Sequence, residues 1–191
     1  MNQENINLPI LYQEIIERSK ELEFPMLSDV YTGNLLRTLA ASKPSGQFLE
    51  LGTGTGLALS WIVDGMNSNS RIISIDNEEK FQAVAKHFFA TDPRVDLVCT
   101  DANQWIIENQ EKRFDLIFAD AWPGKYSVLD ETLQMLNKGG FYLIDDMLAQ
   151  PNWPEGHQQH VDDLITRLEQ RKDIHLIKMN WSTGLILISK K

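Results

Sequence analysis

Short apolar runs alternate with longer amphipathic segments along most of the chain. Five runs have the aliphatic, nearly continuous character of buried parallel strands. They are Gln47–Leu51, Arg71–Ile75, Val95–Cys99, Phe114–Ala119 and Phe141–Asp145. The segments between them have room for a crossover helix each, and the period of Phe81–Phe89 is typical of an amphipathic helix. This alternation predicts an α/β fold with a doubly wound sheet that has helices on both faces.

The last two strand candidates, Ile174–Lys178 and Leu185–Ser189, are separated by only a few residues. A connection this short forms a hairpin and cannot carry a parallel crossover, so the last strand must run antiparallel to its neighbour. Helices are predicted over Val161–Leu168 and, near the N-terminus, over Leu11–Leu22 and Asp29–Ala41. The sequence therefore predicts a mostly parallel, seven-stranded, Rossmann-like sheet with a reversed last strand.

Composition narrows the possible functions. A chain of 191 residues suits a single domain over 1–191, in which 1–42 form the N-terminal helices. The formal net charge of −9, without any basic run, disfavours a nucleic-acid partner. Cys99 is the only cysteine, which excludes an internal disulfide and a multi-cysteine zinc site. Because no apolar stretch is long enough for a bilayer and Met1–Leu8 lacks a signal pattern, we expect a cytoplasmic protein with no membrane partner.

A glycine-rich loop, Gly52-Thr53-Gly54-Thr55-Gly56, follows the first predicted strand and leads into a helix start. This geometry lets a ligand approach backbone N–H groups. The dinucleotide fingerprint requires a third glycine five residues after the first, where Leu57 stands instead. The acidic surroundings favour S-adenosylmethionine, which carries a sulfonium and an ammonium, over a pyrophosphate. The alternative is a glycine turn that only lets strand and helix pack closely.

Each of the first three predicted strands has an acidic residue at or near its carboxyl end. Asp76 ends the second strand, where a carboxylate can accept hydrogen bonds from a ribose diol or cap the next helix. Asp101 follows the third strand and can accept from an adenine amine or cap a helix starting at Ala102. Glu50 either faces the ligand's ammonium or is a satisfied carboxylate at the strand end. The predicted cofactor-binding residues up to this point are Glu50, Gly52, Thr53, Gly54, Gly56, Asp76 and Asp101.

These residues resemble the class I S-adenosylmethionine-dependent methyltransferases. The likeness runs from about Gly33 to the end and depends on Phe48–Gly56, Ile75-Asp76, Asp101-Ala102 and two acidic segments further on. Within that class the chain is most similar to small-molecule O-methyltransferases of the catechol and caffeoyl-CoA type. The resemblance implies a seven-stranded sheet with a reversed last strand. It also implies O-methylation of a small hydroxylated, aromatic acceptor.

The two acidic segments follow the fourth and fifth predicted strands. Asp120 ends the fourth, and Asp145 and Asp146 end the fifth, so the three carboxylates meet at the ligand-binding edge of the sheet. Such a group requires a cation, a neighbouring base or raised pKa values, and its oxygens suit Mg²⁺ or Ca²⁺. The alternative is that Asp120 lines the cofactor's methionine end, as a further cofactor-binding residue, while Asp145 and Asp146 cap a loop.

The resemblance supports a metal site only in part. It implies metal binding by Asp120 and Asp145, but Asp146 stands where the metal-dependent relatives have Asn. The catalytic lysine of the catechol-type enzymes would fall on Pro123, and Lys125 lies two residues further along. No lysine base is therefore assigned, and without a metal a carboxylate such as Asp120, or a histidine, must accept the proton.

The segment after the fifth strand supplies further candidates for the acceptor pocket. His157 and His160 share one face of a helix start, so His157 is either a general base or an exposed surface histidine. Trp122 and Trp153 are either apolar walls for a flat acceptor or hydrophobic plugs in surface loops. Near the N-terminus, Met26 and Gly33 match the family's segment that closes over the cofactor, although Met26 is equally suited to core packing.

Two other functions stay open at this point. An aminopropyl transferase shares the fold and the glycine loop, and an acidic pocket suits a polyamine, although the N-terminal β domain usual in that class is not seen here. A non-catalytic protein that binds an adenosyl ligand is compatible with the missing lysine. A homodimer is also open, because the Leu11–Leu22 helix can pack on its own sheet or on a partner.

Overall fold

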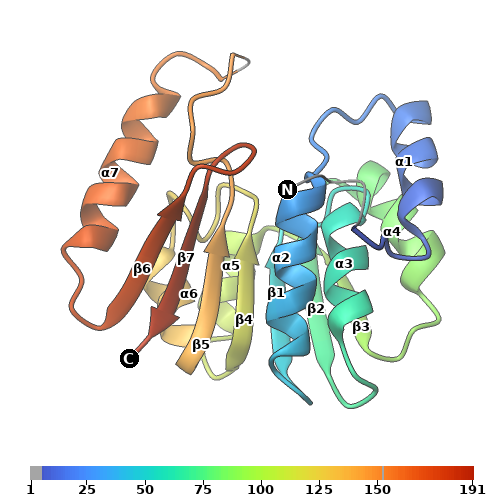
Figure 1. The fold of residues 1–191 in the computed structure, drawn as a ribbon, viewed down its shortest axis with the longest axis horizontal. Helices are drawn as coiled ribbons and strands as arrows, with labels where there is room; N and C mark the ends of the chain where they lie inside the picture. The colour runs from blue at the N-terminus through green and yellow to red at the C-terminus, as the bar shows by residue number, and fades with distance from the viewer. Residues whose placement is uncertain (1–5, 152) are drawn as a thin grey trace.

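The computed structural model describes residues 6–151 and 153–191, and contains a seven-stranded sheet with the order β3-β2-β1-β4-β5-β7-β6 (Figure 1). The strands are β1 (Gln47–Leu51), β2 (Arg71–Asp76), β3 (Val95–Cys99), β4 (Phe114–Ala119), β5 (Leu136–Ile144), β6 (Ile174–Met179) and β7 (Leu185–Lys190). Strands β1 to β5 pair in parallel, and β7 is antiparallel to both β5 and β6. The predicted fold class and the reversed last strand are confirmed. Residues 1–5 of the polar N-terminus and Asn152 of the loop after β5 lie outside the described residues.

Seven helices are described, and they cover both faces of the sheet (Figure 1). They are α1 (Tyr12–Glu21), α2 (Val30–Ala41), α3 (Leu57–Gly65), α4 (Glu79–Phe89), α5 (Ala102–Glu108), α6 (Leu129–Met135) and α7 (His157–Glu169). Alternate residues of β4 divide between the two layers. Leu116 and Phe118 pack in one core with α2, α3 and α4, whereas Ile117 and Ala119 pack in the other with α5, α6 and α7. A sheet buried on both faces explains the continuous apolar strands.

None of the helices in the described part of the chain combines the length and apolar character that a membrane crossing requires.

Strand β5 departs most from the prediction. It starts at Leu136, five residues before the predicted start, and ends at Ile144, so that Asp145 lies just beyond it. The added segment contains Gly139 and Gly140, and Gly139 adopts a φ of +71°. The strand nevertheless continues through them, because the pairing with β4 shifts register between Phe114 and Leu116 and tolerates the irregular backbone.

Helix α1 packs on its own chain, against α3 and α4. Ser19 Oγ donates to Thr55 Oγ1 of the glycine loop at 2.7 Å, and the rings of Tyr12 and Trp61 meet edge to face at 5.8 Å. The N-terminal helix therefore supports the loop from outside. Homodimer formation stays a prediction.

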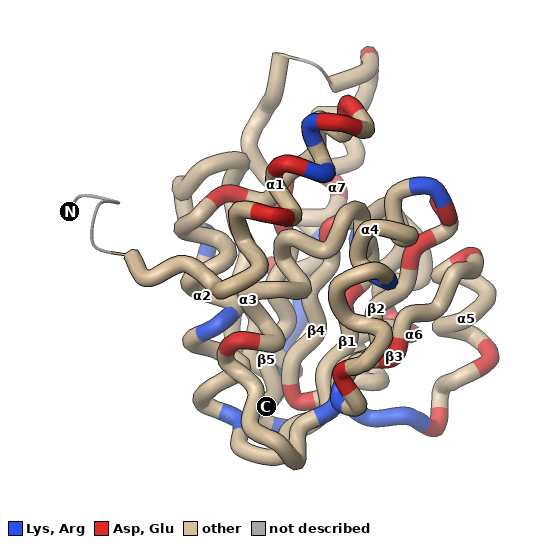
Figure 2. The backbone as a smooth tube through the Cα atoms, turned by 90° about the vertical axis from the view of Figure 1, so that its right-hand side faces the viewer, with Lys and Arg blue, Asp and Glu red and all other residues tan. Residues whose placement is uncertain are grey.

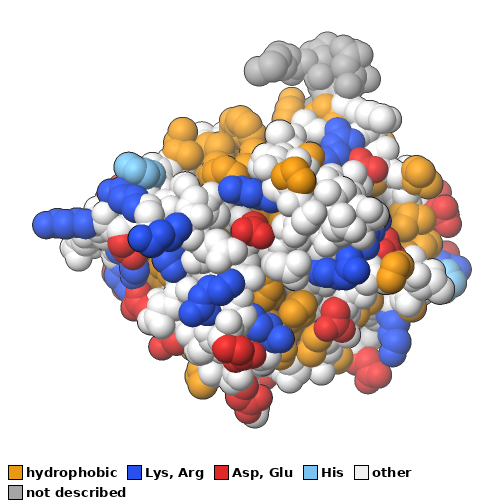
Figure 3. Space-filling model, turned by 90° about the horizontal axis from the view of Figure 1, so that it is seen from below, with side chains coloured by type: hydrophobic (Ala, Val, Ile, Leu, Met, Phe, Trp, Pro, Cys, Tyr) orange, Lys and Arg blue, Asp and Glu red, His pale blue; other side chains and the backbone are white. Residues whose placement is uncertain are grey.

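Charged residues of both signs are spread over the molecule. Figure 2 shows Asp and Glu in both halves of the backbone, with Lys and Arg beside them on α1. Several Lys and Arg side chains gather on the lower face, at the amino ends of the parallel strands (Figure 3). The carboxyl ends of the strands, where α/β proteins bind ligands, lie at the opposite end of the molecule.

Candidate active site

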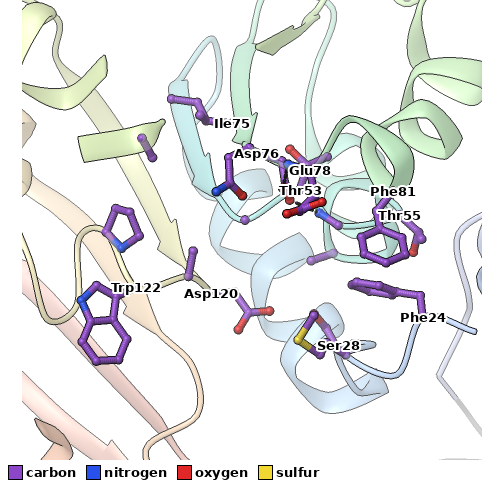
Figure 4. A pocket seen from close by; sticks show the side chains of 18 of the residues that line it. Phe24, Ser28, Thr53, Thr55, Ile75, Asp76, Glu78, Phe81, Asp120 and Trp122 are labelled. Carbon is purple, nitrogen blue, oxygen red and sulfur yellow. Dashed lines mark hydrogen bonds between the residues drawn. The ribbon is translucent and has the colours of Figure 1, made fainter. Parts of the chain in front are cut away.

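A cavity of about 440 Å³ opens at the carboxyl ends of β1, β2 and β4. In Figure 4, Trp122 and Asp120 lie at one end and Phe24 and Phe81 at the other, with Asp76 between them. Five of the lining residues are acidic: Asp76, Glu78, Asp101, Asp120 and Asp146. The described residues that line the cavity include no Lys, Arg or His. The cavity therefore suits a ligand with positive charge better than a phosphorylated one.

The glycine loop forms one wall, and two of its residues must be glycine. Gly52 has a φ of +101°, and a Cβ built on it would lie 2.7 Å from the backbone oxygen of Asp120. Gly54 has a φ of +51°, and its Cβ would lie 2.8 Å from the ring of Phe24. Both positions combine a left-handed backbone with a close neighbour, so a side chain there would push the loop into the cavity or out of its turn.

Buried polar groups hold the loop from below. Thr53 Oγ1 lies 2.6 Å from Ser74 Oγ and accepts from Gln82 Nε2 at 3.1 Å. Ser74 Oγ also donates to Glu50, which is fully buried and whose Oε1 has no partner among the described residues. Burial raises the pKa of Glu50 to about 8, although the Ser74 hydrogen bond opposes the rise.

Glu50 therefore lies beneath the loop and does not line the cavity. The prediction that it faces the ligand's ammonium is wrong for this arrangement. The acid precedes the end of β1 by one residue, and its side chain points into the protein beside Ser74 of the neighbouring strand. Gly52, Thr53 and Gly54, by contrast, line the cavity, and their cofactor-binding role stays a prediction. Gly56 packs against Ala85 of α4.

Asp76 and Asp101 lie on the cavity wall and also cap local backbone. Asp76 accepts from Gly54 N at 2.7 Å through one oxygen and from Glu78 N at 2.8 Å through the other. Asp101 accepts from Asn103 N at 2.7 Å as the N-cap of α5. The predicted N-cap role is thus present for Asp101, whereas the N-cap of α4 is Glu78 and Asp76 bonds backbone that precedes the helix. Both carboxylates also line the cavity.

Two aromatic residues at the far end were not among the predicted site residues. The rings of Phe24 and Phe81 pack at 4.7 Å and line the cavity. Phe81 looked like a core position because it belongs to the apolar stripe of α4. Met26 lines the cavity as the resemblance implied, but Gly33 does not. Gly33 instead lets α2 pack against the indole of Trp61, which a Cβ would approach to 2.3 Å.

The predicted acidic cluster forms at the other end of the cavity. Asp120 lines the cavity, and burial raises its pKa well above the usual range, with a further rise from the charge of Asp145. Asp145 is buried, and its Oδ1 accepts from Thr183 Oγ1 at 2.6 Å and from Asp146 N at 2.8 Å. Burial raises the pKa of Asp145 to about 6, although the Thr183 hydrogen bond opposes the rise. Lys125 Nζ donates to the backbone oxygen of Asp145 at 2.9 Å and lies 3.9 Å from Asp146 Oδ2.

The donor set does not fit the predicted metal site. Over residues 6–151 and 153–191, no group of three or more His, Cys, Asp and Glu side chains is arranged to hold a metal ion. The Asp145 carboxylate is already engaged by Thr183, and an ammonium stands beside Asp146. The assignment of Asp120, Asp145 and Asp146 as a metal-binding group is therefore corrected.

Aromatic and histidine rings surround the open side of this cluster. Trp122, which lines the cavity, packs on Tyr126 with centroids 4.7 Å apart, and Trp153 packs on His157 at 4.4 Å. Tyr126 Oη lies 3.2 Å from His157 Nε2, whereas His160 is exposed. Burial lowers the pKa of His157, helped by the charges of Lys125 and His160, and burial raises the pKa of Tyr126 to about 12. A neutral imidazole thus stands beside a protonated phenol.

Similarity to known proteins shows the family to which this chain belongs. The profile of a family described as a methyltransferase domain matches residues 49–147, more than half of the chain. The chain belongs to this methyltransferase family. The matched region contains the glycine loop together with Asp76, Asp101, Asp120 and Asp145. The resemblance found in the sequence is thereby confirmed at the level of the family.

Relatives and solved structures agree with this membership. A protein of Mycolicibacterium vanbaalenii, named provisionally as an O-methyltransferase, is 28% identical over 117 residues, which cover 59% of this chain and 52% of that protein. The chain spans about half the length of the curated relatives it matches.

Two solved structures share the fold of the whole methyltransferase domain. The O-methyltransferase TomG of Streptomyces achromogenes, in complex with S-adenosylmethionine, is 19% identical with a TM-score of 0.85 over 98% of this chain and 92% of TomG. The methyltransferase PaMTH1 of Podospora anserina, bound to S-adenosylhomocysteine, is 22% identical with a TM-score of 0.85 over 99% of this chain and 92% of PaMTH1. At these identities the likeness shows the fold.

Proposed function

We propose that this methyltransferase domain transfers the methyl group of S-adenosylmethionine to an oxygen of a small hydroxylated, aromatic acceptor. The observation that carries the proposal is the cavity at the glycine loop, which is lined by five acidic residues and by no Lys or Arg among the described residues. Such a lining attracts a sulfonium and an ammonium and repels a phosphate. TomG, whose fold this chain shares, was solved in complex with S-adenosylmethionine.

The cavity has groups suited to each part of this cofactor. When bound, it supplies a methyl group on a positively charged sulfur, which becomes a neutral thioether as the acceptor oxygen takes the methyl. Asp76 accepts hydrogen bonds from the ribose hydroxyls, and Asp101 accepts from the adenine amine. Phe24 and Phe81 offer apolar surface at their end of the cavity, and Asp120 lies at the opposite end.

The acceptor binds at the Asp120 end, between Trp122 and the helix start of α7. Trp122, Tyr126 and Trp153 provide flat apolar surface suited to an aromatic ring. His157 donates its Nε2–H to Tyr126 Oη, and its free Nδ1 takes the proton that the acceptor hydroxyl loses as the oxygen bonds to the methyl carbon. Its lowered pKa keeps the ring neutral and able to accept at neutral pH, and Tyr126 Oη fixes its orientation. Alignment of the acceptor by these walls supplies much of the rate enhancement.

Calorimetric titration with S-adenosylhomocysteine tests the cofactor site. We expect binding to the wild type and a loss of about 10- to 100-fold for Asp76→Ala, because two charge-assisted hydrogen bonds to the ribose are removed. Glu79→Ala, an exposed acid on the first turn of α4 outside the cavity, is the matched control. Unchanged affinity in Asp76→Ala would contradict the ribose role, and preferential binding of a phosphorylated nucleotide would contradict the cofactor.

Activity is then measured on a panel of phenols, catechols, amines and polyamines. Methyl transfer to hydroxylated aromatic compounds supports the proposal. Consumption of a decarboxylated donor with a polyamine would indicate the aminopropyl transferase that an acidic cavity also suits. Binding of S-adenosylhomocysteine without any transfer would indicate an adenosyl-ligand-binding protein that is not an enzyme.

A further inference from the structure

Lys125 is a buried lysine at the acceptor end of the cavity, with 4% of its side chain exposed. The turn that carries it follows β4 and is held firmly. Lys125 N and Tyr126 N both donate to Trp122 O, at 3.2 and 3.0 Å. Tyr142 Oη, from β5 below, donates to Gly124 O at 2.6 Å. This turn fixes the backbone so that the lysine side chain enters the protein and does not extend into solvent.

The Lys125 ammonium ends beside the carboxylate of Asp146 and the backbone of Asp145. It donates to Asp145 O at 2.9 Å and lies 3.9 Å from Asp146 Oδ2. Its charge also opposes the rise in pKa that burial and Asp145 impose on Asp120. The ring of Tyr126 completes its surroundings, with the ring centroid 5.9 Å from Nζ. The ammonium therefore already provides the positive charge that a cluster of carboxylates requires.

We infer that Lys125 is the resident cation of the Asp120, Asp145 and Asp146 cluster, so that the acceptor end of the site is organised without a divalent metal ion. The inference rests on the proposed function, since it concerns the same site. Lys125 is a positioning residue, because it holds Asp145 and Asp146 and does not line the cavity itself. A divalent ion requires carboxylate oxygens that converge on one point, and it would be repelled by an ammonium at that place.

Metal binding gives a readout that does not depend on turnover. Mn²⁺ is titrated into the wild type, Lys125→Met and Lys125→Arg, and free Mn²⁺ is followed by electron paramagnetic resonance. We expect weak binding to the wild type and to the arginine variant, and binding at least about tenfold tighter in the methionine variant, because one opposing charge is gone. Lys178→Met, which removes an exposed lysine of β6 that pairs with Glu169 of α7, is the matched control and should bind as the wild type does.

A second substitution locates the gained site. Adding Asp146→Gly to Lys125→Met should abolish the gain, and glycine suits the φ of +60° at this position. Equal Mn²⁺ affinity in the wild type and Lys125→Met would overturn the inference, as would a gain that survives the loss of the Asp146 carboxylate. Thermal melts check that each variant folds, and Lys125→Gln replaces the methionine variant if the latter does not.

Turnover with and without added metal provides a second test, in the wild type and in the same variants. We expect turnover to be unchanged by EDTA and by added Mg²⁺, whereas Lys125→Met should lose turnover and regain part of it with Mg²⁺, and Lys125→Arg should keep turnover. Wild-type turnover that requires Mg²⁺ would overturn the inference while leaving the proposed methyl transfer intact. Failure to bind S-adenosylhomocysteine would instead count against the proposed function, so the two failures are distinguishable.

Discussion

The two ends of the cavity are built in different ways. The cofactor end is made mainly of backbone, from a contiguous loop over Gly52–Gly56 in which Asp76 accepts from the Gly54 N–H. The acceptor end is made of side chains from four separate places: the turn after β4, the end of β5, the β6–β7 hairpin and the start of α7. A site formed by one contiguous loop can be predicted from local sequence, whereas a site formed by distant side chains depends on tertiary packing. We therefore expect substitutions at the cofactor end to change cofactor binding and substitutions at the acceptor end to change turnover.

The largest expected effect is at the acceptor end, on His157. We expect His157→Gln to reduce kcat by roughly 10²- to 10⁴-fold, the usual range for losing a general base, while S-adenosylhomocysteine affinity stays as in the wild type. The variant retains a polar side chain near Tyr126 but cannot take up the proton. Steady-state kinetics and calorimetry measure the two quantities separately.

His160→Gln is the matched control, since His160 lies on the same helix and also contacts Trp122, but makes no hydrogen bond to Tyr126. Its kcat should stay close to that of the wild type. An equal loss in both variants would mean that α7 only shapes the pocket, and the proton would then have to pass to a carboxylate such as Asp120.

The same contrast explains what the sequence could predict. The strand pattern and the short connection before β7 were enough for the fold, because buried parallel strands and hairpins have local signatures. The glycine loop and Asp76 were predicted for the same reason. The burial of Lys125 was not, because it depends on Tyr142 of β5 reaching Gly124 across the sheet, and no periodicity encodes that contact. The Thr183 hydrogen bond to Asp145 was missed likewise, since the two residues are 38 positions apart.

The next largest expected effect is a loss of cofactor affinity when a side chain is added to the glycine loop. Gly54→Ala should weaken S-adenosylhomocysteine binding by about tenfold or more, because the new Cβ meets Phe24 at 2.8 Å and either residue must move into the cavity. Gly139→Ala is the matched control, since its φ of +71° imposes a similar strain but nothing lies within 4 Å of the added Cβ. Both variants should lose about 1–2 kcal/mol of stability from the left-handed backbone.

Calorimetry measures how strongly each variant binds S-adenosylhomocysteine, and urea unfolding measures how much stability each variant loses from backbone strain. If Gly139→Ala weakened binding as much as Gly54→Ala, the loss would reflect general destabilisation and not the fit of the loop. If Gly54→Ala bound normally, the loop would not form the wall of the cofactor site.

The error over Glu50 shows where local sequence fails even at the cofactor end. Its position two residues before Gly52 suggested a ligand contact, but the side chain at this position of β1 points into the core towards Ser74. Burial then raises its pKa to about 8, from an ordinary value of 4.5. The folded protein consequently keeps a proton on Glu50 at a pH where the unfolded chain has lost it.

This proton leads to an effect that leaves ligand binding and turnover aside, a pH-dependent change in stability. Between about pH 4.5 and pH 8 the folded state binds more protons than the unfolded state, so the Glu50 contribution to the free energy of unfolding falls as pH rises, by about 1.4 kcal/mol per pH unit. Glu50→Gln removes this contribution, because the amide does not titrate. The difference in unfolding free energy between variant and wild type should therefore grow in favour of the variant from pH 5 to pH 8, in urea titrations at each pH. Glu111→Gln, an exposed position, should show a flat difference over the same range. A flat difference for Glu50→Gln as well would mean that Glu50 is ionised in the folded protein, and that a cation or a water chain reaches the unpartnered Oε1 beneath the glycine loop.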